Sequence, residues 1–258
     1  MNFENNTVTL FEVSWEVCNK VGGIFSVVSS KALQAVEQFG EDYFLLGPAL
    51  NENPGFEETD ESVWDSLKMA FATRDLKCRM GRWNIPGRPK VILVDFAKRY
   101  SSNQLLYDLW KGYGVDSLSG GWDYIEPVMF ATACGAVIAS IHENRVEPME
   151  GRSVALFHEW MCGAGLLSLK KLAPGVGTVF TTHATMLGRA MAGTGRDIYS
   201  NLRNINPANE AAALNITAKW SLEGVSAREA DVFTTVSPIT GEESTVLLGR
   251  QPDVITTN

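Results

Sequence analysis

A lysine and two glycines near the N-terminus have the types and spacing of a phosphate-binding turn. Lys20, Gly22 and Gly23 stand between a run rich in β-branched and aromatic residues and a segment with helical periodicity. Uncovered backbone N–H groups at the positive end of a helix suit an anion, and the lysine adds a charge. The same residues also fit an ordinary Gly-Gly turn with a solvated lysine.

Two later segments each place a histidine after an apolar run. His183 is followed six residues on by Arg189, and such a pair can hydrogen-bond a sugar hydroxyl and hold a phosphate bidentately. His158, Glu159 and Trp160 combine a donor, a carboxylate and an aromatic ring on which a sugar can stack. The alternatives are a core histidine with a surface arginine in the first segment, and a packed Trp with a capping Glu in the second.

Several common catalytic motifs are absent from the sequence. It has no Gly-Lys pair, no complete dinucleotide fingerprint, no His-Glu-x-x-His and no Asp-x-Asp, which argues against P-loop, nicotinamide, zincin and D-x-D transferase chemistry. We therefore expect no metal and no cofactor. With Lys+Arg 22 against Asp+Glu 30 and a net charge of -8, nucleic acid and anionic membranes are not expected partners. An anionic ligand must meet a local cluster of cations.

The composition is that of a folded protein without a membrane anchor. Of the 258 residues, 45% are hydrophobic and 20% charged. The longest apolar stretch, residues 128–141, is shorter than the roughly 20 residues of a spanning helix. The four cysteines lie far apart without a C-x-x-C pair, and no signal peptide is recognisable. We therefore expect reduced thiols and a cytoplasmic location.

Alternating strands and helices are predicted to position these residues. The expected strands are residues 8–17, 43–46, 82–84, 90–96, 153–157, 178–182 and 231–236. The expected helices are residues 24–39, 63–71, 123–144 and 161–172, with one more after Ser237. We expect Asp123 to cap the long helix with Glu126 as its capping-box partner. Residues 51–61 are expected to form a solvated connection, and residues 104–120 a partly irregular surface segment.

This alternation predicts an α/β fold with a parallel sheet and helices on both faces. In that architecture ligands gather at the carboxyl ends of the strands. All the candidate residues follow predicted strands, so we expect them to lie at one edge of the sheet.

Four segments, in the same order, resemble motifs of the eukaryotic-type glycogen synthases, glycosyltransferase family 3. The segments are FEVSWEVCNKVGGI at 11–24, FHEWMCG at 157–163, FTTHATMLGR at 180–189 and DVFTTVSPIT at 231–240. The family motifs to which they are similar are FEVAWEVxNKVGGI, FHEWLAG, FTTHATLLGR and VFTTVSQIT. Residues 250–258 resemble the segment that leads into that family's second domain. Four matches in one order make coincidence very improbable.

The resemblance implies a Rossmann-like domain, the N-terminal half of a GT-B fold. Residues 1–258 would form the acceptor-side domain, and the C-terminal nucleotide-binding domain would be absent from the chain. The implied activity is retaining transfer of glucose from a nucleotide sugar to the non-reducing end of an α-1,4-glucan. UDP-glucose is the favoured donor and ADP-glucose the alternative. The isolated chain is expected to be inactive, and a homo-oligomer is left open.

The resemblance also implies roles for individual residues. The implied catalytic residues are His183, Lys20 and Arg189. The implied substrate-binding residues are Lys20, Gly22, Gly23, His183, Arg189, Glu159, Trp160 and Glu16. Lys20, the two glycines and Arg189 would face the donor phosphates, His183 the transferred glucose, and the carboxylates the glucan. The alternatives are a GT-B transferase with another sugar or acceptor, and a glucan-binding fragment without catalysis.

Overall fold

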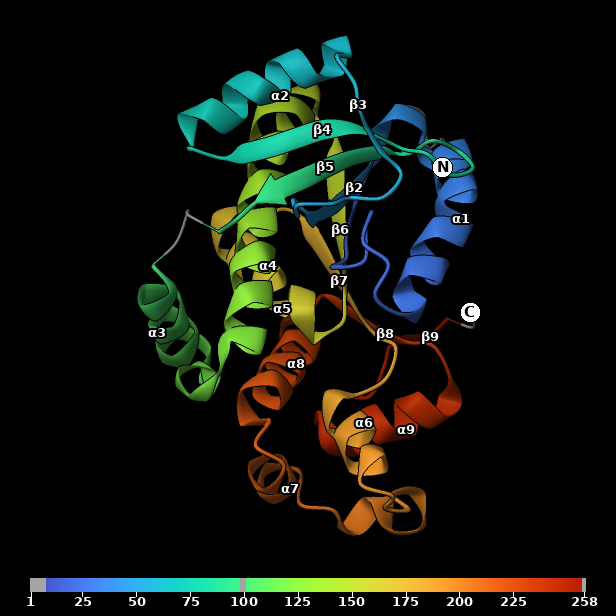
Figure 1. Ribbon diagram of the computed structural model, residues 1–258, viewed down its shortest axis with the longest axis vertical. Coiled ribbons are helices and arrows are strands. Elements are labelled where there is room, and N and C mark those ends of the chain that lie inside the picture. Colours follow the sequence, from blue (N-terminus) through green and yellow to red (C-terminus); the bar gives the residue numbers. More distant parts are fainter. Residues whose placement is uncertain (1–7, 98–100, 257–258) are drawn as a thin grey trace.

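The computed structural model describes residues 8–97 and 101–256. Its centre is a nine-stranded sheet with the order β3-β4-β5-β2-β1-β6-β7-β8-β9, seen nearly edge-on in Figure 1. The strands are β1 (Val8–Val13), β2 (Tyr43–Pro48), β3 (Phe56–Glu58), β4 (Lys77–Trp83), β5 (Lys90–Asp95), β6 (Arg152–His158), β7 (Gly177–Thr182), β8 (Val232–Thr235) and β9 (Val254–Ile255). All neighbours pair in parallel except β4, which is antiparallel to β3 and to β5.

Helices connect the strands and cover both faces of the sheet. They are α1 (Gly23–Phe39), α2 (Ser62–Thr73), α3 (Ser102–Tyr113), α4 (Trp122–Ile141), α5 (Trp160–Leu172), α6 (Met186–Gly193), α7 (Pro207–Ala213), α8 (Thr217–Glu229) and α9 (Pro238–Leu247). Figure 1 shows α1 on one side of the sheet and α4 and α5 on the other, with α6, α7 and α9 gathered beyond the ends of β7 and β8. The predicted α/β architecture is confirmed.

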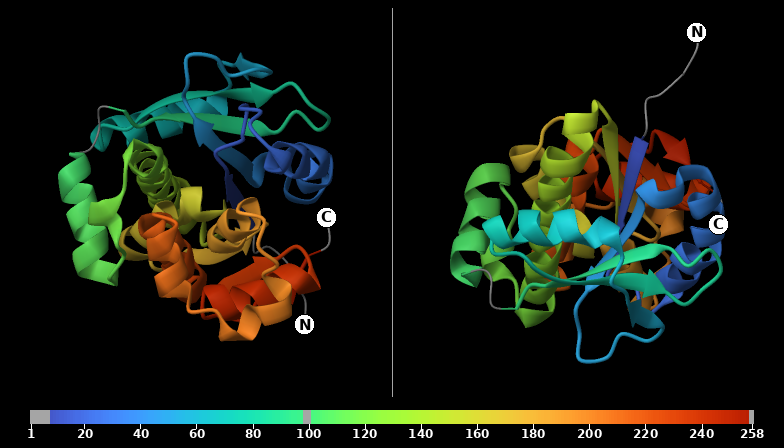
Figure 2. Two further views of the ribbon diagram at one scale, coloured as in Figure 1. Left: turned by 60° about the horizontal axis from the view of Figure 1, so that its bottom comes forward. Right: turned by 90° about the horizontal axis from the view of Figure 1, so that it is seen from above.

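Alternating side chains of the buried strands divide the core into two parts. Tyr43 and Leu45 of β2 pack with α1 on one face, whereas Phe44 and Leu46 pack with α2, α4 and α5 on the other. This is the period of two that a strand buried on both faces requires. The view from below in Figure 2 shows the same two layers around the sheet. Because β1, β6, β7 and β8 are parallel neighbours, their carboxyl ends lie at one edge of the sheet.

Helix α4 is apolar all round because it lies inside the protein. The segment Trp122–Met149 is long and apolar enough to cross a membrane, yet 83% of its most apolar window is buried in this fold. Glycines let α4 and α5 approach closely: a Cβ at Gly165 would lie 2.4 Å from the carbonyl oxygen of Ala131, and one at Gly135 would lie 2.6 Å from the carbonyl oxygen of Gly165. The expected partner of α4 is thus protein rather than lipid.

Replacing Gly165 by alanine should lower the free energy of unfolding by about 1–3 kcal/mol. The added methyl group meets backbone atoms, so helix α5 must move away from α4, and overpacking of this kind costs that amount. Gly193→Ala is the matched control, because a Cβ there has no atom within 4 Å and should gain up to about 1 kcal/mol of helix propensity. Urea unfolding of both variants measures the difference, and equal midpoints would contradict the close-packing argument.

Several predicted elements differ from the structure. Residues 51–61, expected to form a solvated connection, contain the short edge strand β3, which pairs with β4. The first strand ends at Val13 rather than residue 17, because residues 14–17 form a turn in which the Val17 N–H donates to the Ser14 carbonyl. Residues 102–113 form the regular helix α3, which Gly114 ends at a φ of 68°. The capping box at Asp123 is wrong: Gly121 is the N-cap of α4, and Asp123 pairs with Lys219. Of the expected segment 250–258, residues 257–258 lie outside the described residues.

Candidate functional site

A buried carboxylate holds the turn between β7 and α6. Glu159 accepts hydrogen bonds from the backbone N–H groups of His183 at 2.9 Å and Ala184 at 3.2 Å. Arg189 of α6 places Nη2 3.8 Å from Glu159 Oε1. Glu159 is 5% exposed, whereas the Arg189 side chain is 61% exposed. The carboxylate therefore fixes the turn, and the guanidinium remains accessible to a ligand.

Glu159 itself has a strained backbone. Its φ of 64° and ψ of 168° lie in a region that residues other than glycine rarely adopt, at a cost of about 1–3 kcal/mol. Surrounding hydrogen bonds hold it there: its N–H donates to the Thr181 carbonyl at 2.8 Å, and the Cys162 N–H donates to its carbonyl at 3.0 Å. Backbone strain of this kind clusters at functional sites.

Two further buried carboxylates hold the same turn. Glu223 of α8 accepts the N–H of Met186 at 2.8 Å, and Glu243 of α9 accepts the hydroxyl of Thr185. Burial raises the pKa of Glu159, while Arg189 and the two turn amides act to lower it. Burial also raises the pKa of Glu223. The turn that carries His183 is thus fixed from three elements before any ligand arrives, which is the preorganisation a catalytic group needs.

A second polar network lies on the α1 face of the sheet. Glu12 of β1 contacts Lys31 Nζ and His158 Nε2 through Oε1, each at 2.6 Å, and its Oε2 accepts the hydroxyl of Tyr43 at 2.5 Å. His158 Nδ1 lies 2.9 Å from Nε2 of His183. The network therefore runs from α1 through the buried strands to the strand end at His183.

The charges in this network follow from burial. Desolvation works against the charge on Glu12, but Lys31 and the His158 hydrogen bond outweigh it and lower the pKa of Glu12 to about 2. Burial lowers the pKa of His158. Burial, assisted by His158 and Lys31, lowers the pKa of His183 to about 3. At neutral pH the network therefore holds one carboxylate, one ammonium and two uncharged imidazoles.

A pocket of about 830 Å³ opens beside this network. It lies between α1 and the strands β6, β7 and β8. Its lining residues include Lys31, His158, Thr181, His183 and Thr234. A cavity of this size suits a sugar-sized or nucleotide-sized ligand.

The predicted phosphate site at the start of α1 is partly filled by the chain itself. Glu16 Oε2 accepts the N–H of Gly22 at 2.7 Å and that of Phe25 at 2.9 Å. Gly23 is unobstructed, since a Cβ there would meet no atom within 4 Å. Lys20 is exposed, forms no ion pair with any described residue, and places Nζ 5.8 Å from the Phe25 ring centroid. A phosphate at this helix end would have to displace the Glu16 carboxylate or share the end with it.

The structure brings the two groups of candidates close to each other. Lys31, on the helix that Gly22 and Gly23 begin, is bonded to the network that ends at His183. The strands β1, β6 and β7, which the candidate residues follow, are parallel neighbours in the sheet. Their carboxyl ends therefore lie at one edge of the sheet, as the sequence predicts.

Trp160 is part of the packing and offers no sugar platform. The residue is 8% exposed, its ring is stacked on Tyr124 at 6.1 Å, and Lys219 Nζ lies over it at 5.3 Å from the ring centroid. Sugar stacking requires an exposed ring face, so that expectation is wrong, and the alternative of a packed Trp holds. Its neighbour Glu159 is also buried, and its carboxylate accepts from the backbone of the turn, so it supports the turn instead of contacting a glucan as the resemblance implies.

Comparison with known proteins identifies the family. A profile described as "Glycogen synthase" matches residues 12–258. The chain belongs to the glycogen synthase family. It is 38% identical over 255 residues to the human liver glycogen [starch] synthase, covering 96% of this chain and 36% of that protein. It is 34% identical to the glycogen [starch] synthase of Caenorhabditis elegans, covering 96% and 38%. The chain thus spans little more than a third of the length of these relatives.

Solved structures with similar folds are more distant. The catalytic domain of starch synthase IV from Arabidopsis thaliana, bound to ADP and acarbose, aligns with a TM-score of 0.49 at 13% identity, covering 98% of this chain and 52% of that one. A UDP-forming α,α-trehalose-phosphate synthase from Burkholderia vietnamiensis aligns with a TM-score of 0.46 at 10% identity, covering 92% and 42%.

Sequence reasoning missed several residues that hold this candidate site in place. Lys31 and Glu12 carried a signal, because each is a charged residue in an otherwise apolar stretch. Glu223 and Glu243 carried none, since they lie 37 and 58 residues beyond the residues they bind, on helices whose other features are ordinary. Only the fold brings such residues to the site.

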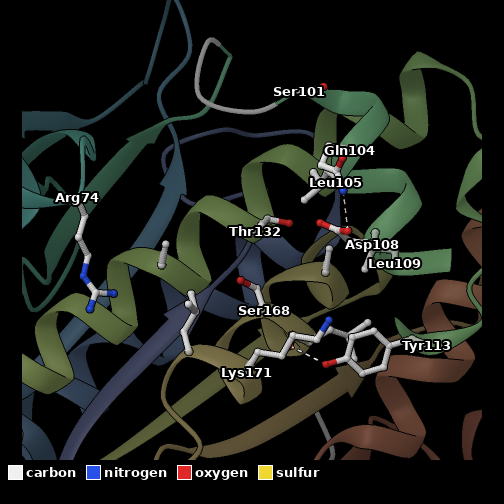
Figure 3. A pocket seen from close by; sticks show the side chains of 14 residues that line it. Arg74, Ser101, Gln104, Leu105, Asp108, Leu109, Tyr113, Thr132, Ser168 and Lys171 are labelled. Carbon is white, nitrogen blue, oxygen red and sulfur yellow. Dashed lines mark hydrogen bonds between the residues drawn. The ribbon is translucent and has the colours of Figure 1, made fainter. Parts of the chain in front are cut away.

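A second pocket lies away from the strand ends. It has a volume of about 760 Å³ and lies between α3, α4 and α5 (Figure 3). Two of its polar side chains form hydrogen bonds within its wall: Gln104 donates to Asp108 at 2.9 Å, and Tyr113 donates to the Leu167 carbonyl at 3.0 Å. The described residues contain no group of three or more His, Cys, Asp or Glu that could hold a metal ion.

Proposed function

We propose that this chain supplies the acceptor-side domain of a retaining glucosyltransferase that extends an α-1,4-glucan. The donor is a nucleotide sugar, with UDP-glucose favoured over ADP-glucose. Family membership supports the reaction class, and the fixed turn that carries His183 beside the accessible Arg189 is the observation that carries the proposal. We propose that the reaction takes place in the cytoplasm; the four cysteines are free thiols.

The chemistry needs cations at the leaving group and polar groups at the sugar. As the glycosidic bond to the diphosphate breaks, negative charge grows on the leaving oxygen and the sugar becomes oxocarbenium-like. We infer that Arg189 and Lys20 neutralise the diphosphate, and that the N-terminal end of α1, which the phosphate would share with the Glu16 carboxylate, adds the positive end of its dipole. His183 faces the transferred glucose, while Glu159 holds the turn from beneath and Glu16 lies toward the glucan. Two side-chain cations supply the charge without a metal.

We further propose that activity requires a second domain. The relatives are roughly three times as long as the matched region, which spans 36% of the human protein and 38% of the nematode one. A GT-B arrangement, with two Rossmann-like domains facing a cleft, would put the nucleotide pocket mainly on the part that these 258 residues do not match. The donor base is therefore recognised elsewhere, and the sugar and phosphates meet the residues described above.

Glucose transfer to glycogen tests this function directly. UDP-glucose and ADP-glucose are each offered to the 258-residue chain and to the full-length product of its gene, and incorporated glucose is measured. We expect transfer only by the longer protein, faster with UDP-glucose. Transfer by the 258-residue chain alone would overturn the two-domain proposal. Absence of transfer by both proteins would overturn the glucan synthase proposal and favour a glucan-binding role or another sugar.

A further inference from the structure

The charge states in the Glu12 network determine which ring nitrogens carry protons. An ionised carboxylate can only accept hydrogen bonds, so the 2.6 Å contact between Glu12 Oε1 and His158 Nε2 requires a proton on that nitrogen. A neutral imidazole has one protonated nitrogen. His158 Nδ1 is therefore unprotonated and can only accept.

The hydrogen bond between the two imidazole rings determines which nitrogen of His183 carries its proton. His158 Nδ1 lies 2.9 Å from His183 Nε2, and because the first nitrogen accepts, the second must donate. His183 then carries its proton on Nε2, and its Nδ1 keeps a free lone pair. The centroids of the two rings are 5.2 Å apart. His183 also lines the pocket beside α1.

We propose that Glu12 and His158 are positioning residues that lock His183 in the Nε2–H tautomer. His183 then offers a ligand a hydrogen-bond acceptor, Nδ1, and no donor. Such a group binds a hydroxyl of the sugar and gives nothing to a phosphate oxygen, which can only accept. The assignment rests on the proposed function for its role in catalysis, while the tautomer itself follows from the protein alone.

Lys31 and Tyr43 complete the lock. Glu12 is almost wholly buried, with a side-chain exposure of 1%, so its charge requires partners. The Lys31 ammonium supplies the opposite charge at 2.6 Å, and the Tyr43 hydroxyl occupies the other carboxylate oxygen at 2.5 Å. These two contacts keep the carboxylate ionised and fix its rotation, so Oε1 stays directed at His158.

Nitrogen-15 NMR of the imidazoles tests the tautomers in the 258-residue chain. The protein has three histidines, and substituting His142 by glutamine assigns one of them at once. At pH 7 we expect His158 and His183 each to show a protonated Nε2 and an unprotonated Nδ1. A protonated Nδ1 on either ring, or a doubly protonated ring, would overturn the proposal.

Two variants separate positioning from mere packing. Glu12→Gln keeps a carbonyl oxygen that can accept from His158, whereas Glu12→Leu removes every acceptor. We expect the Gln variant to keep the tautomer of His183 and the Leu variant to show a mixture of both. In the full-length protein the Leu variant should lose about tenfold in kcat, the fold-change for one lost hydrogen bond. The Gln variant should restore most of that loss.

The two readouts separate this inference from the proposed function. If the tautomers are as expected and the full-length protein transfers no glucose, the tautomer assignment is confirmed and the proposed reaction is wrong. If glucose transfer is measured and the tautomers differ, only the tautomer assignment is wrong. Equal kcat for Glu12→Leu and the unsubstituted enzyme would overturn the positioning role of Glu12 and His158 in the reaction, because His183 would then serve as well in either tautomer.

Discussion

His183→Ala in the full-length protein is expected to lower kcat for glucose transfer by about 10²–10³-fold. The ring is held by the hydrogen bond to His158, and its backbone is held by Glu159. It is therefore set in place for the transition state, and loss of one such preorganised contact typically has this effect. Steady-state kinetics with saturating glycogen measure kcat, and circular dichroism checks that the variant is folded.

His142→Ala is the matched control for this experiment. His142 begins the helical turn after α4, with Nδ1 2.9 Å from the Ser153 hydroxyl, and Ser153 lies at the start of β6, at the other end of the strand from His158. Its removal deletes an equal number of atoms away from the site, so kcat should be unchanged. If His183→Ala retained the unsubstituted rate, the assignment of His183 to the reaction would be wrong.

The sequence was sufficient for the architecture because local pattern dictates it. Alternating apolar runs and helical periods recur along the chain, and the buried strand Tyr43–Pro48 reads as one unbroken apolar run. Element ends were less predictable. Val13 ends β1 although residues 14–17 continue the apolar pattern, because Trp15 turns into the core and packs edge-on against Phe130 at 5.2 Å. That contact spans more than a hundred residues.

The candidate site was predictable only where residues follow a strand. Lys20, Glu159, His183 and Arg189 could be found because the carboxyl ends of parallel strands are where ligands bind. The carboxylates beneath the turn could not be found in this way, because burial and contact across the fold give them their role. Trp160 illustrates the converse: its type suited sugar stacking, but its neighbour across the fold, Tyr124, covers it.

The position of Glu16 was also beyond sequence reasoning. The Gly-Gly turn predicted uncovered amides, and the structure places a carboxylate on two N–H groups there, of Gly22 and Phe25. A side chain six residues before a helix can return to cap it only if the intervening turn has the right shape. Here Cys18, with a φ of 51°, provides the reversal. Whether Glu16 contacts a glucan stays a prediction.

Arg189→Ala should also lower kcat by about 10²–10³-fold, because it removes a positive charge that stabilises the leaving diphosphate and not a contact to the sugar. The Arg189 side chain is 61% exposed and lies beside the turn that carries His183, so its guanidinium is free to move onto a diphosphate as charge develops. Arg189→Lys keeps the charge and loses the planar fork, so its kcat should fall between the two. Transfer rates of the three full-length proteins, at saturating donor, measure the order.

Arg196→Ala distinguishes a specific role from a general loss of positive charge. Arg196 is 46% exposed, follows α6 in the same region, and pairs with Glu210 on the surface, so its removal changes the net charge equally. We expect no change in kcat for this variant. A loss equal to that of Arg189→Ala would mean that the local potential, and not a placed guanidinium, attracts the donor; such a loss would shrink as salt is added, because screening acts on exposed charges.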